Sequence, residues 1–143
     1  MSTASHLARV GRLLDSADRW ECVHFAARSE IRVFEGVAAK SFHVATIPGA
    51  VLASDAELFD ALAEAFRFPD YFGRNWDAVA DCLGDLEWLD AEGFLLIVDD
   101  AGRSGLAEPF GRLVQIWLSS AQEWSAEGKP FHLVALLEHY GDS

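Results

Sequence analysis

Three aspartates stand at intervals of four residues in the segment YFGRNWDAVADCLGDL, which covers residues 71–86. On an α-helix this spacing stacks Asp77, Asp81 and Asp85 along one face, where each pair of like charges repels by a few tenths of a kcal/mol. Such repulsion is tolerated on a solvated face, or it is relieved by positive charges on another molecule. Because carboxylates on a helix bind arginine through paired hydrogen bonds, the pattern indicates either a plain acidic surface or a site for a cationic partner.

A second pair of acids, Glu123 and Glu127, has the same spacing on a long helix expected at residues 106–127. Both glutamates lie away from the apolar stripe of that helix and therefore face outward. Asp77 is near the expected start of its own helix, where the helix dipole stabilises a carboxylate, whereas Asp81 lies one turn further on and gains little. Two helices thus each present a carboxylate pair.

The helix that carries the aspartates is expected to begin after Asn75, whose side chain suits an N-cap. Trp76, Val79 and Leu83 fall on one side of it and predict the buried face. The aspartates fall roughly opposite that face. The acidic row reaches Asp85 only if the helix runs through the glycine that precedes it.

The rest of the chain alternates between strand and helix patterns. Residues 42–47 have the composition of a strand, and 94–98 and 131–137 are nearly continuous apolar runs, as in parallel strands that are buried on both faces. Residues 54–66 have the spacing of an amphipathic helix. This order predicts an α/β fold with a short parallel sheet of about three strands packed with helices.

The first part of the chain fits this pattern less well. We expect residues 42–143 to form the α/β domain and residues 1–41 to form an N-terminal extension, as part of that domain or as a flap. Within the extension, the pattern is compatible with a helix near 4–17 and extended pieces near 21–26 and 30–35. Whether these pieces add strands to the sheet is left open.

Charge restricts the class of partner. The net charge is −12, and between Arg74 and Arg103 the chain has no Lys or Arg and eight acidic side chains. Nucleic acid would be repelled, because binding a phosphate backbone requires basic residues that displace counterions. A cationic partner would be attracted.

Length and composition set the remaining limits. A chain of 143 residues with 51% hydrophobic content predicts one domain with a real core. No segment approaches the length of a membrane span or the core of a signal peptide, so we expect a cytoplasmic protein with no membrane partner. Two cysteines, Cys22 and Cys82, form no metal-ligand spacing and are expected to be buried thiols rather than a disulfide. Nothing in the sequence indicates the oligomeric state.

The segment FPDYFGRNWDAVADCL, residues 68–83, resembles the characteristic motif of the barstar family, the intracellular inhibitors of barnase-type secreted ribonucleases. The order of strands and helices from about residue 42 to 137 also agrees with that family. The resemblance implies a barstar-like fold and a protein that acts as an inhibitor and not as an enzyme. It also implies a basic ribonuclease as the partner and no cofactor or metal.

The resemblance assigns roles to particular residues. Tyr71 occupies the position of the loop tyrosine that packs against the catalytic histidine of the nuclease. Asp77, followed by Ala78, matches an interface aspartate, and Asp81 matches the aspartate that replaces a substrate phosphate in the nuclease active site. The positions that match and that we expect to contact the partner are Tyr71, Gly73, Asn75, Asp77, Ala78, Asp81, Glu123 and Glu127.

Three positions depart from the best-known pattern of the family. Ala80 and Leu86 replace aromatic residues, and Trp88 lies close enough in the sequence to compensate for one of them. Arg74 places a positive charge where the best-known member of the family has an acid, and this charge would repel a basic nuclease locally. These departures leave the identity of the target open.

Other functions fit parts of the pattern. The first is a barstar-like binding or immunity protein for a different toxin or for a partner that is no nuclease. The second is a hydrolase in which Asp77 and Glu123 act as acid and base. However, both carboxylates are expected on solvent-facing surfaces, without the apolar pocket that raises a catalytic pKa, and no established hydrolase motif is present.

A metal site is the third alternative. Carboxylate and imidazole side chains occur together near the ends of two expected strands, at Asp99, Asp100, His132 and His139. The acids are also of the kind that commonly ends a strand of an α/β sheet. A single histidine inside an apolar run is more often a hydrogen-bonded core residue than a ligand.

Overall fold

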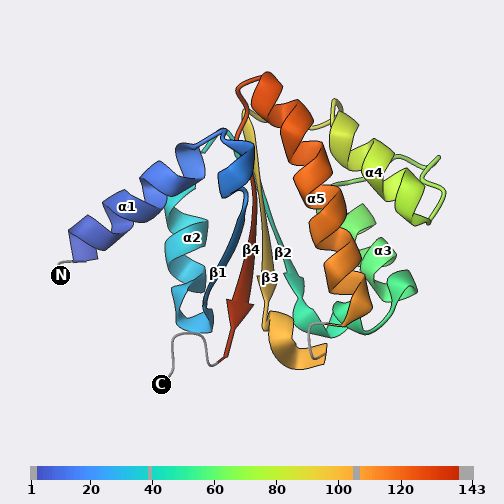
Figure 1. The fold of residues 1–143 in the computed structure, drawn as a ribbon, viewed down its shortest axis with the longest axis horizontal. Coiled ribbons are helices and arrows are strands. Elements are labelled where there is room, and N and C mark those ends of the chain that lie inside the picture. Colours follow the sequence, from blue (N-terminus) through green and yellow to red (C-terminus); the bar gives the residue numbers. More distant parts are fainter. Residues whose placement is uncertain (1–2, 39, 105–106, 139–143) are drawn as a thin grey trace.

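The computed structural model describes residues 3–38, 40–104 and 107–138. Its centre is a parallel sheet of four strands in the order β1-β4-β3-β2. The strands are β1 (Val23–Ala27), β2 (Phe42–Pro48), β3 (Gly93–Asp99) and β4 (Phe131–Leu137). The helices are α1 (Thr3–Asp15), α2 (Ile31–Val37), α3 (Asp55–Ala65), α4 (Trp76–Asp85) and α5 (Glu108–Ala126). Figure 1 shows the sheet edge-on, with α1 and α2 on one side and the other three helices on the opposite side.

The α/β class and the parallel sheet are confirmed, but the expected number of about three strands is wrong. The fourth strand, β1, comes from the N-terminal extension and pairs in parallel with β4, from Val23 opposite Leu133 to Ala27 opposite Leu137. Its side chains are only partly buried, because β1 lies at an edge of the sheet. The periodicity of a short, half-exposed strand is weak, which explains why the sequence left its pairing open.

The extended piece expected near residues 30–35 is also wrong, because α2 forms there. Ile31 and Val33 alternate with a polar arginine and so have the pattern of a strand. The three-residue interval from Ile31 to Phe34 to Val37 decides the structure, because it places these side chains on one helical face. Phe34 is buried in the core below that face.

Two hydrophobic cores lie on the two faces of the sheet. Along β3, Phe94, Leu96 and Val98 belong to the core under α3, α4 and α5, whereas Leu95 and Ile97 belong to the core under α1 and α2. Successive side chains of a strand point to opposite faces, so a strand that is covered on both sides needs an unbroken apolar run. This confirms the sequence interpretation of the runs in β3 and β4.

A chain of hydrogen bonds between histidines links the N-terminal segment to the centre of the sheet. His132, in β4, is fully buried, and its Nε2 donates to the carbonyl oxygen of Ser16 at 2.8 Å. Because a carbonyl only accepts, the other nitrogen of His132, Nδ1, is the acceptor for Nε2 of His24 at 2.9 Å. Burial and the neighbouring His132 lower the pKa of His24 to about 4, and burial also lowers the pKa of His132. His132 is thus a hydrogen-bonded core residue, as expected.

This pair predicts a loss of stability in mild acid. His24 takes up a proton near pH 6.5 in the unfolded chain but only near its lowered pKa of about 4 in the folded protein. Its contribution is therefore fully present above pH 6.5 and is lost as the pH falls toward 4. Between pH 7 and 5 we expect a loss of about 2 kcal/mol in the free energy of unfolding, measured by urea denaturation.

The matched variant is His24→Gln, which retains a donor for Nδ1 of His132 and has no proton to gain. It should show a smaller decrease in stability over the same pH range. An identical pH dependence in the variant and the wild type would show that His24 is not the responsible group.

Candidate functional site

The start of α4 is held by three residues of the motif that contact one another. Asn75 is the N-cap, and its Oδ1 accepts from the backbone N–H of Ala78 at 2.7 Å. Its Nδ2 donates to the carbonyl oxygen of Gly73 at 3.3 Å. A Cβ on Gly73 would lie 3.3 Å from Nδ2 of Asn75, which is tighter than usual. These contacts show that Gly73, Asn75 and Ala78 fix the loop and the first turn of the helix; contact with a partner remains a prediction for all three.

The helix runs through Gly84 and ends at Asp85, where Leu86 adopts a left-handed conformation. Asp85 therefore completes the row with Asp77 and Asp81. All three aspartates are exposed, and in the described part of the chain none has a hydrogen bond or an ion pair. The row consequently keeps its like-charge repulsion in the isolated protein.

Helix α5 contacts the last turn of α4 through a hydrogen bond. The buried indole Nε1 of Trp124 donates to the carbonyl oxygen of Leu83 at 2.8 Å. One residue further along α4, a Cβ on Gly84 would lie only 2.8 Å from Oε2 of Glu123. The carboxylate of Glu123 therefore lies against the backbone of α4, in space that is open because residue 84 has no side chain.

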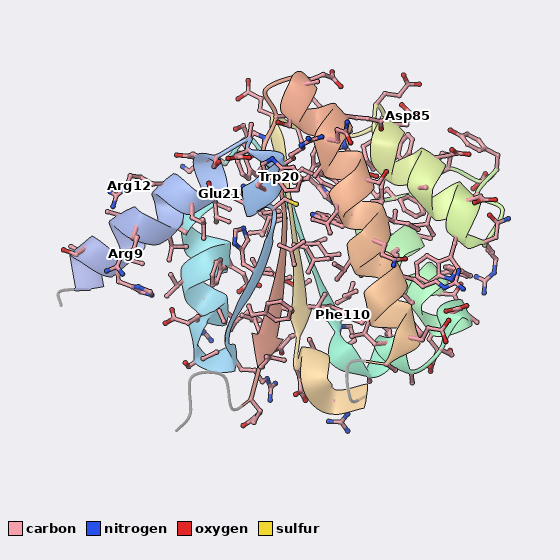
Figure 2. All side chains as sticks on the ribbon, viewed as in Figure 1. Arg9, Arg12, Trp20, Glu21, Asp85 and Phe110 are labelled. Atoms are coloured by element: carbon pink, nitrogen blue, oxygen red, sulfur yellow. The ribbon has the colours of Figure 1, made fainter. Side chains whose placement is uncertain are left out.

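Glu127 follows at the end of α5, and with Gly84 and Asp85 it lines a groove of about 550 Å³. Figure 2 shows Asp85 at the end of α4 that adjoins the last turns of α5. The structure thus brings the acids of the two helices onto one face. We call this face the acidic surface; it consists of Asp77, Asp81, Asp85, Glu123 and Glu127.

Tyr71 lies in the loop before α4, and 73% of its surface is exposed. Desolvation against the protein raises the pKa of its phenol, and the nearby carboxylates of Asp85 and Glu87 raise it further. The phenol is therefore neutral at pH 7 and retains its O–H as a donor. Both acids belong to the end of α4 and the turn that follows it, so the phenol lies within the electrostatic field of that end of the helix.

Aromatic packing explains why Tyr71 points outward. Phe68 and Phe72 pack against each other, with ring centroids 4.9 Å apart. Phe68 also contacts Trp88, and Phe72 contacts Phe59 of α3. These contacts anchor the loop on both sides of Tyr71, which leaves its ring free to contact another molecule. The sequence motif identified Tyr71 but gave no indication of this anchor.

The positive charge of Arg74 is neutralised within the protein. Its guanidinium forms an ion pair with the carboxylate of Asp60, on α3. Arg74 has a positive φ of 52°, which a non-glycine residue adopts only when surrounding contacts hold it. The local repulsion that the sequence suggested is therefore offset by an acid that lies 14 residues earlier.

The groove beside the acidic surface adds residues that sequence reasoning missed. Glu87 and Asp90, from the turn after α4, line it together with Lys129. The ammonium group of Lys129 donates to the carbonyl oxygen of Ala91 at 3.3 Å and lies 5.6 Å from the ring centre of Trp124. The turn folds back over the end of α5, and no local spacing in the sequence indicates that contact.

The arrangement gives no support to the hydrolase alternative. Glu123 lies beside Gly84, which is two helical turns, or about 10 Å, along α4 from Asp77. Both carboxylates are exposed, whereas a catalytic acid needs an apolar pocket that raises its pKa. Asp77 and Glu123 instead belong to different parts of an exposed surface.

The residues considered for a metal site have other partners. Arg28 donates from Nε to Asp99 at 3.0 Å, and its Nη1 lies 4.0 Å from the carboxylate of Asp100. His132 is occupied by the hydrogen bonds in the sheet core, and His139 lies outside the described residues. Within the described ranges, no group of three or more His, Cys, Asp or Glu is arranged to hold a metal ion. Cys22 and Cys82 are buried free thiols, as expected.

Taken together, the described residues form a small parallel α/β domain with exposed carboxylates on two helices that pack against each other. The chain belongs to the barstar family, because the family model described as Barstar (barnase inhibitor) matches residues 42–135, well over half of its length. The resemblance found in the sequence is thereby confirmed. A search of curated proteins gave no match. None of the helices in the described part of the chain is both long and apolar enough to cross a membrane.

The contact between Gly84 and Glu123 gives a prediction about stability. Gly84→Ala should raise the free energy of unfolding by about 0.5 kcal/mol, because alanine favours the helix more than glycine does. The new methyl group should also displace the flexible Glu123 carboxylate. Urea denaturation measures the first effect.

Gly111→Ala on α5 is the control, because a Cβ there meets nothing within 4 Å. The difference between the two variants isolates the cost of moving Glu123. If Gly84→Ala instead destabilised the protein by more than about 1 kcal/mol, the carboxylate of Glu123 would be held rigidly against α4.

Proposed function

We propose that this protein is an inhibitor of a barnase-type ribonuclease and that it blocks the active site with the acidic surface and the Tyr71 loop. The observation that carries the proposal is the exposed, unpaired state of Asp77 and Asp81 on a capped helix inside the segment that matches the family. In the isolated protein only Asp77 is stabilised by its position, through the helix dipole, whereas a complex with a cationic site would relieve the repulsion along the whole row.

The proposed mechanism is replacement of a phosphate by carboxylates. A ribonuclease must stabilise negative charge on phosphorus, so its active site concentrates basic side chains. Asp81 would occupy the position of a substrate phosphate among those cations, with Asp77 pairing beside it through bidentate hydrogen bonds. Because the N-cap and the Trp124 contact already hold α4, binding does not have to order the carboxylates first.

The other site residues would extend the contact. Tyr71, neutral and anchored by its aromatic neighbours, would pack against the catalytic base of the nuclease. Glu123 and Glu127 would pair with basic residues at the rim of the active site. The ion pair of Arg74 with Asp60 supports this model, because it reduces the positive charge that would otherwise face a basic enzyme.

The first test is Asp81→Ala, measured by calorimetric titration against barnase-type ribonucleases and by inhibition of RNA cleavage. We expect a loss of at least about 2 kcal/mol in binding free energy, the usual level of a hot spot. The free energy of unfolding should stay the same or rise slightly, because one like-charge pair on each side of Asp81 disappears.

Asp15→Ala is the matched control, because it removes an exposed carboxylate from α1, on the other side of the sheet. It should bind as tightly as the wild type. If Asp81→Ala also bound as tightly as the wild type, the proposed blocking of the active site by α4 would be wrong. If the wild type bound no ribonuclease of this type, the result would favour a different partner.

A second test concerns salt. Attraction between a protein of net charge −12 and a basic enzyme accelerates their encounter, and this attraction is screened beyond about 8 Å at physiological ionic strength. We therefore expect the association rate, measured by stopped-flow fluorescence, to decrease steadily with added salt. The dissociation rate should change much less, since contacts inside the interface are screened weakly. An association rate that is independent of salt would contradict an electrostatic encounter.

A further inference from the structure

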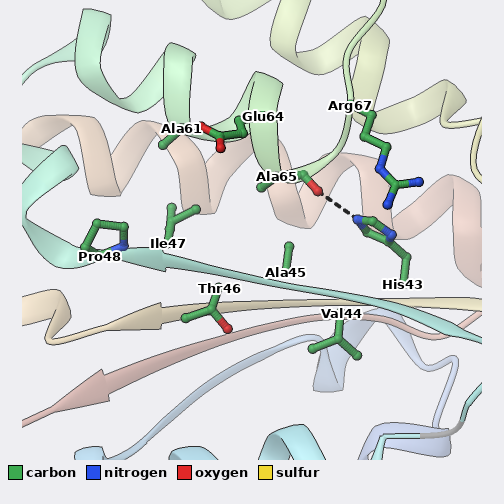
Figure 3. A pocket seen from close by; sticks show the side chains of 10 residues that line it. All are labelled: His43, Val44, Ala45, Thr46, Ile47, Pro48, Ala61, Glu64, Ala65 and Arg67. Atoms are coloured by element: carbon green, nitrogen blue, oxygen red, sulfur yellow. Dashed lines mark hydrogen bonds between the residues drawn. The ribbon is translucent and has the colours of Figure 1, made fainter.

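Among the residues that the structure describes, strand β2 pairs with β3 alone and therefore forms an edge of the sheet. On the outer side of an edge strand, the N–H and C=O groups of alternate residues have no strand partner. A groove of about 450 Å³ follows this edge, between β2 and α3 (Figure 3). It is lined by β2 residues 43–48 and by Ala61, Glu64, Ala65 and Arg67.

The edge lacks the devices that usually prevent strand pairing. Exposed edges are commonly protected by charged side chains or proline within the strand. β2 has the sequence FHVATIP, in which proline occurs only at the last position and no residue is acidic or a lysine or arginine. His43, the one titratable side chain, is tied to the carbonyl oxygen of Ala65 by a 2.7 Å hydrogen bond. Small and apolar side chains therefore leave the backbone of β2 accessible to another strand.

The charges beside this edge have opposite signs at its two ends. Arg67 lies near His43 at the start of β2, and Glu64 lies above Ile47 in the second half of the strand (Figure 3). Both side chains are exposed, and neither forms an ion pair within the described ranges.

Two further charged side chains lie beside β2. Lys40 precedes the strand and lines a cavity together with Arg67 and the acid Asp90, whereas Glu35 of α2 accepts a hydrogen bond from Oγ1 of Thr46 at 3.4 Å. Lys40 and Arg67 thus flank the start of the strand, and Glu64 and Glu35 flank its end.

We propose that β2 pairs in an antiparallel manner with β2 of a second copy of this chain, across a two-fold axis near Ala45. Antiparallel pairing brings the start of one strand to the end of the other. Arg67 then faces Glu64 of the partner subunit, and the two-fold axis repeats this pair, as in any isologous interface. The result is one continuous sheet of twice four strands, whereas parallel pairing would bring like charges together.

The observations also set the expected strength of this dimer. An interface made of one strand edge and its flanking ion pairs buries a small area, so the dimer should be weak and its population should depend strongly on concentration. Two copies with a net charge of −12 repel each other at long range, and salt at physiological strength screens that repulsion. Sedimentation equilibrium of the full chain at that salt, from micromolar to millimolar concentration, should show a monomer–dimer equilibrium.

Charge reversal tests the geometry. Glu64→Arg alone and Arg67→Glu alone should each weaken self-association by at least about tenfold, because both cross-axis pairs become like-charged. An equimolar mixture of the two variants should associate again, since each copy then supplies the charge that the other lacks. Arg112→Glu is the control for the change in net charge, because Arg112 lies on α5 and pairs with Glu108 there.

Two results would overturn the proposal. One is a wild-type protein that remains monomeric at millimolar concentration. The other is a mixture of the two variants that associates no better than either alone, with circular dichroism showing that both are folded. The proposal is independent of the proposed function, because it uses no residue of the acidic surface and none of these experiments requires a nuclease.

Discussion

The buried hydrogen bond from the indole of Trp124 to the carbonyl oxygen of Leu83 is the contact on which the candidate site depends. The last four carbonyl groups of a helix accept no hydrogen bond from within the helix. Burying one of them without a donor lowers the stability of the fold by about 1 to 3 kcal/mol. Trp124 supplies that donor to the last turn of α4 from the side of α5. The same contact fixes the distance between the aspartates of one helix and the glutamates of the other. A core interaction thus determines the layout of surface charge.

The sheet supports this arrangement from behind. Its two central strands are buried on both faces, so it needs helices on both sides. Helices α3, α4 and α5 cover one face and carry the site, whereas α1 and α2 cover the other. The residues before β2 therefore provide the second cover and one edge strand. The family match begins at residue 42, which indicates that the acidic surface belongs to the shared part of the fold.

Local patterns predicted the elements that are strongly periodic or strongly capped. The N-cap at Asn75, the aspartate row and the two-sided strands follow from spacing that a helix or a buried strand imposes directly. The pairing of β1 with β4 did not follow, because a half-exposed edge strand has little periodicity. Nor did the Arg74–Asp60 pair or the contact of Glu123 with Gly84, since each joins segments that are distant in sequence. The motif indicated the candidate site, and tertiary packing decided how its members face one another.

The order of the strands has a consequence for how the chain folds as it is made. β1 has β4 as its neighbour, so the first of the four described strands pairs with the fourth, and Val23 meets Leu133 only after all the residues between them have been made. β3 likewise lacks one of its two neighbours until β4 forms. Strands that are far apart in the sequence pair slowly, because the entropy of loop closure is lost before the stabilising contacts between them form. Until then β1 and β3 both carry open edges, which makes the nascent chain dependent on β4 for protection against aggregation.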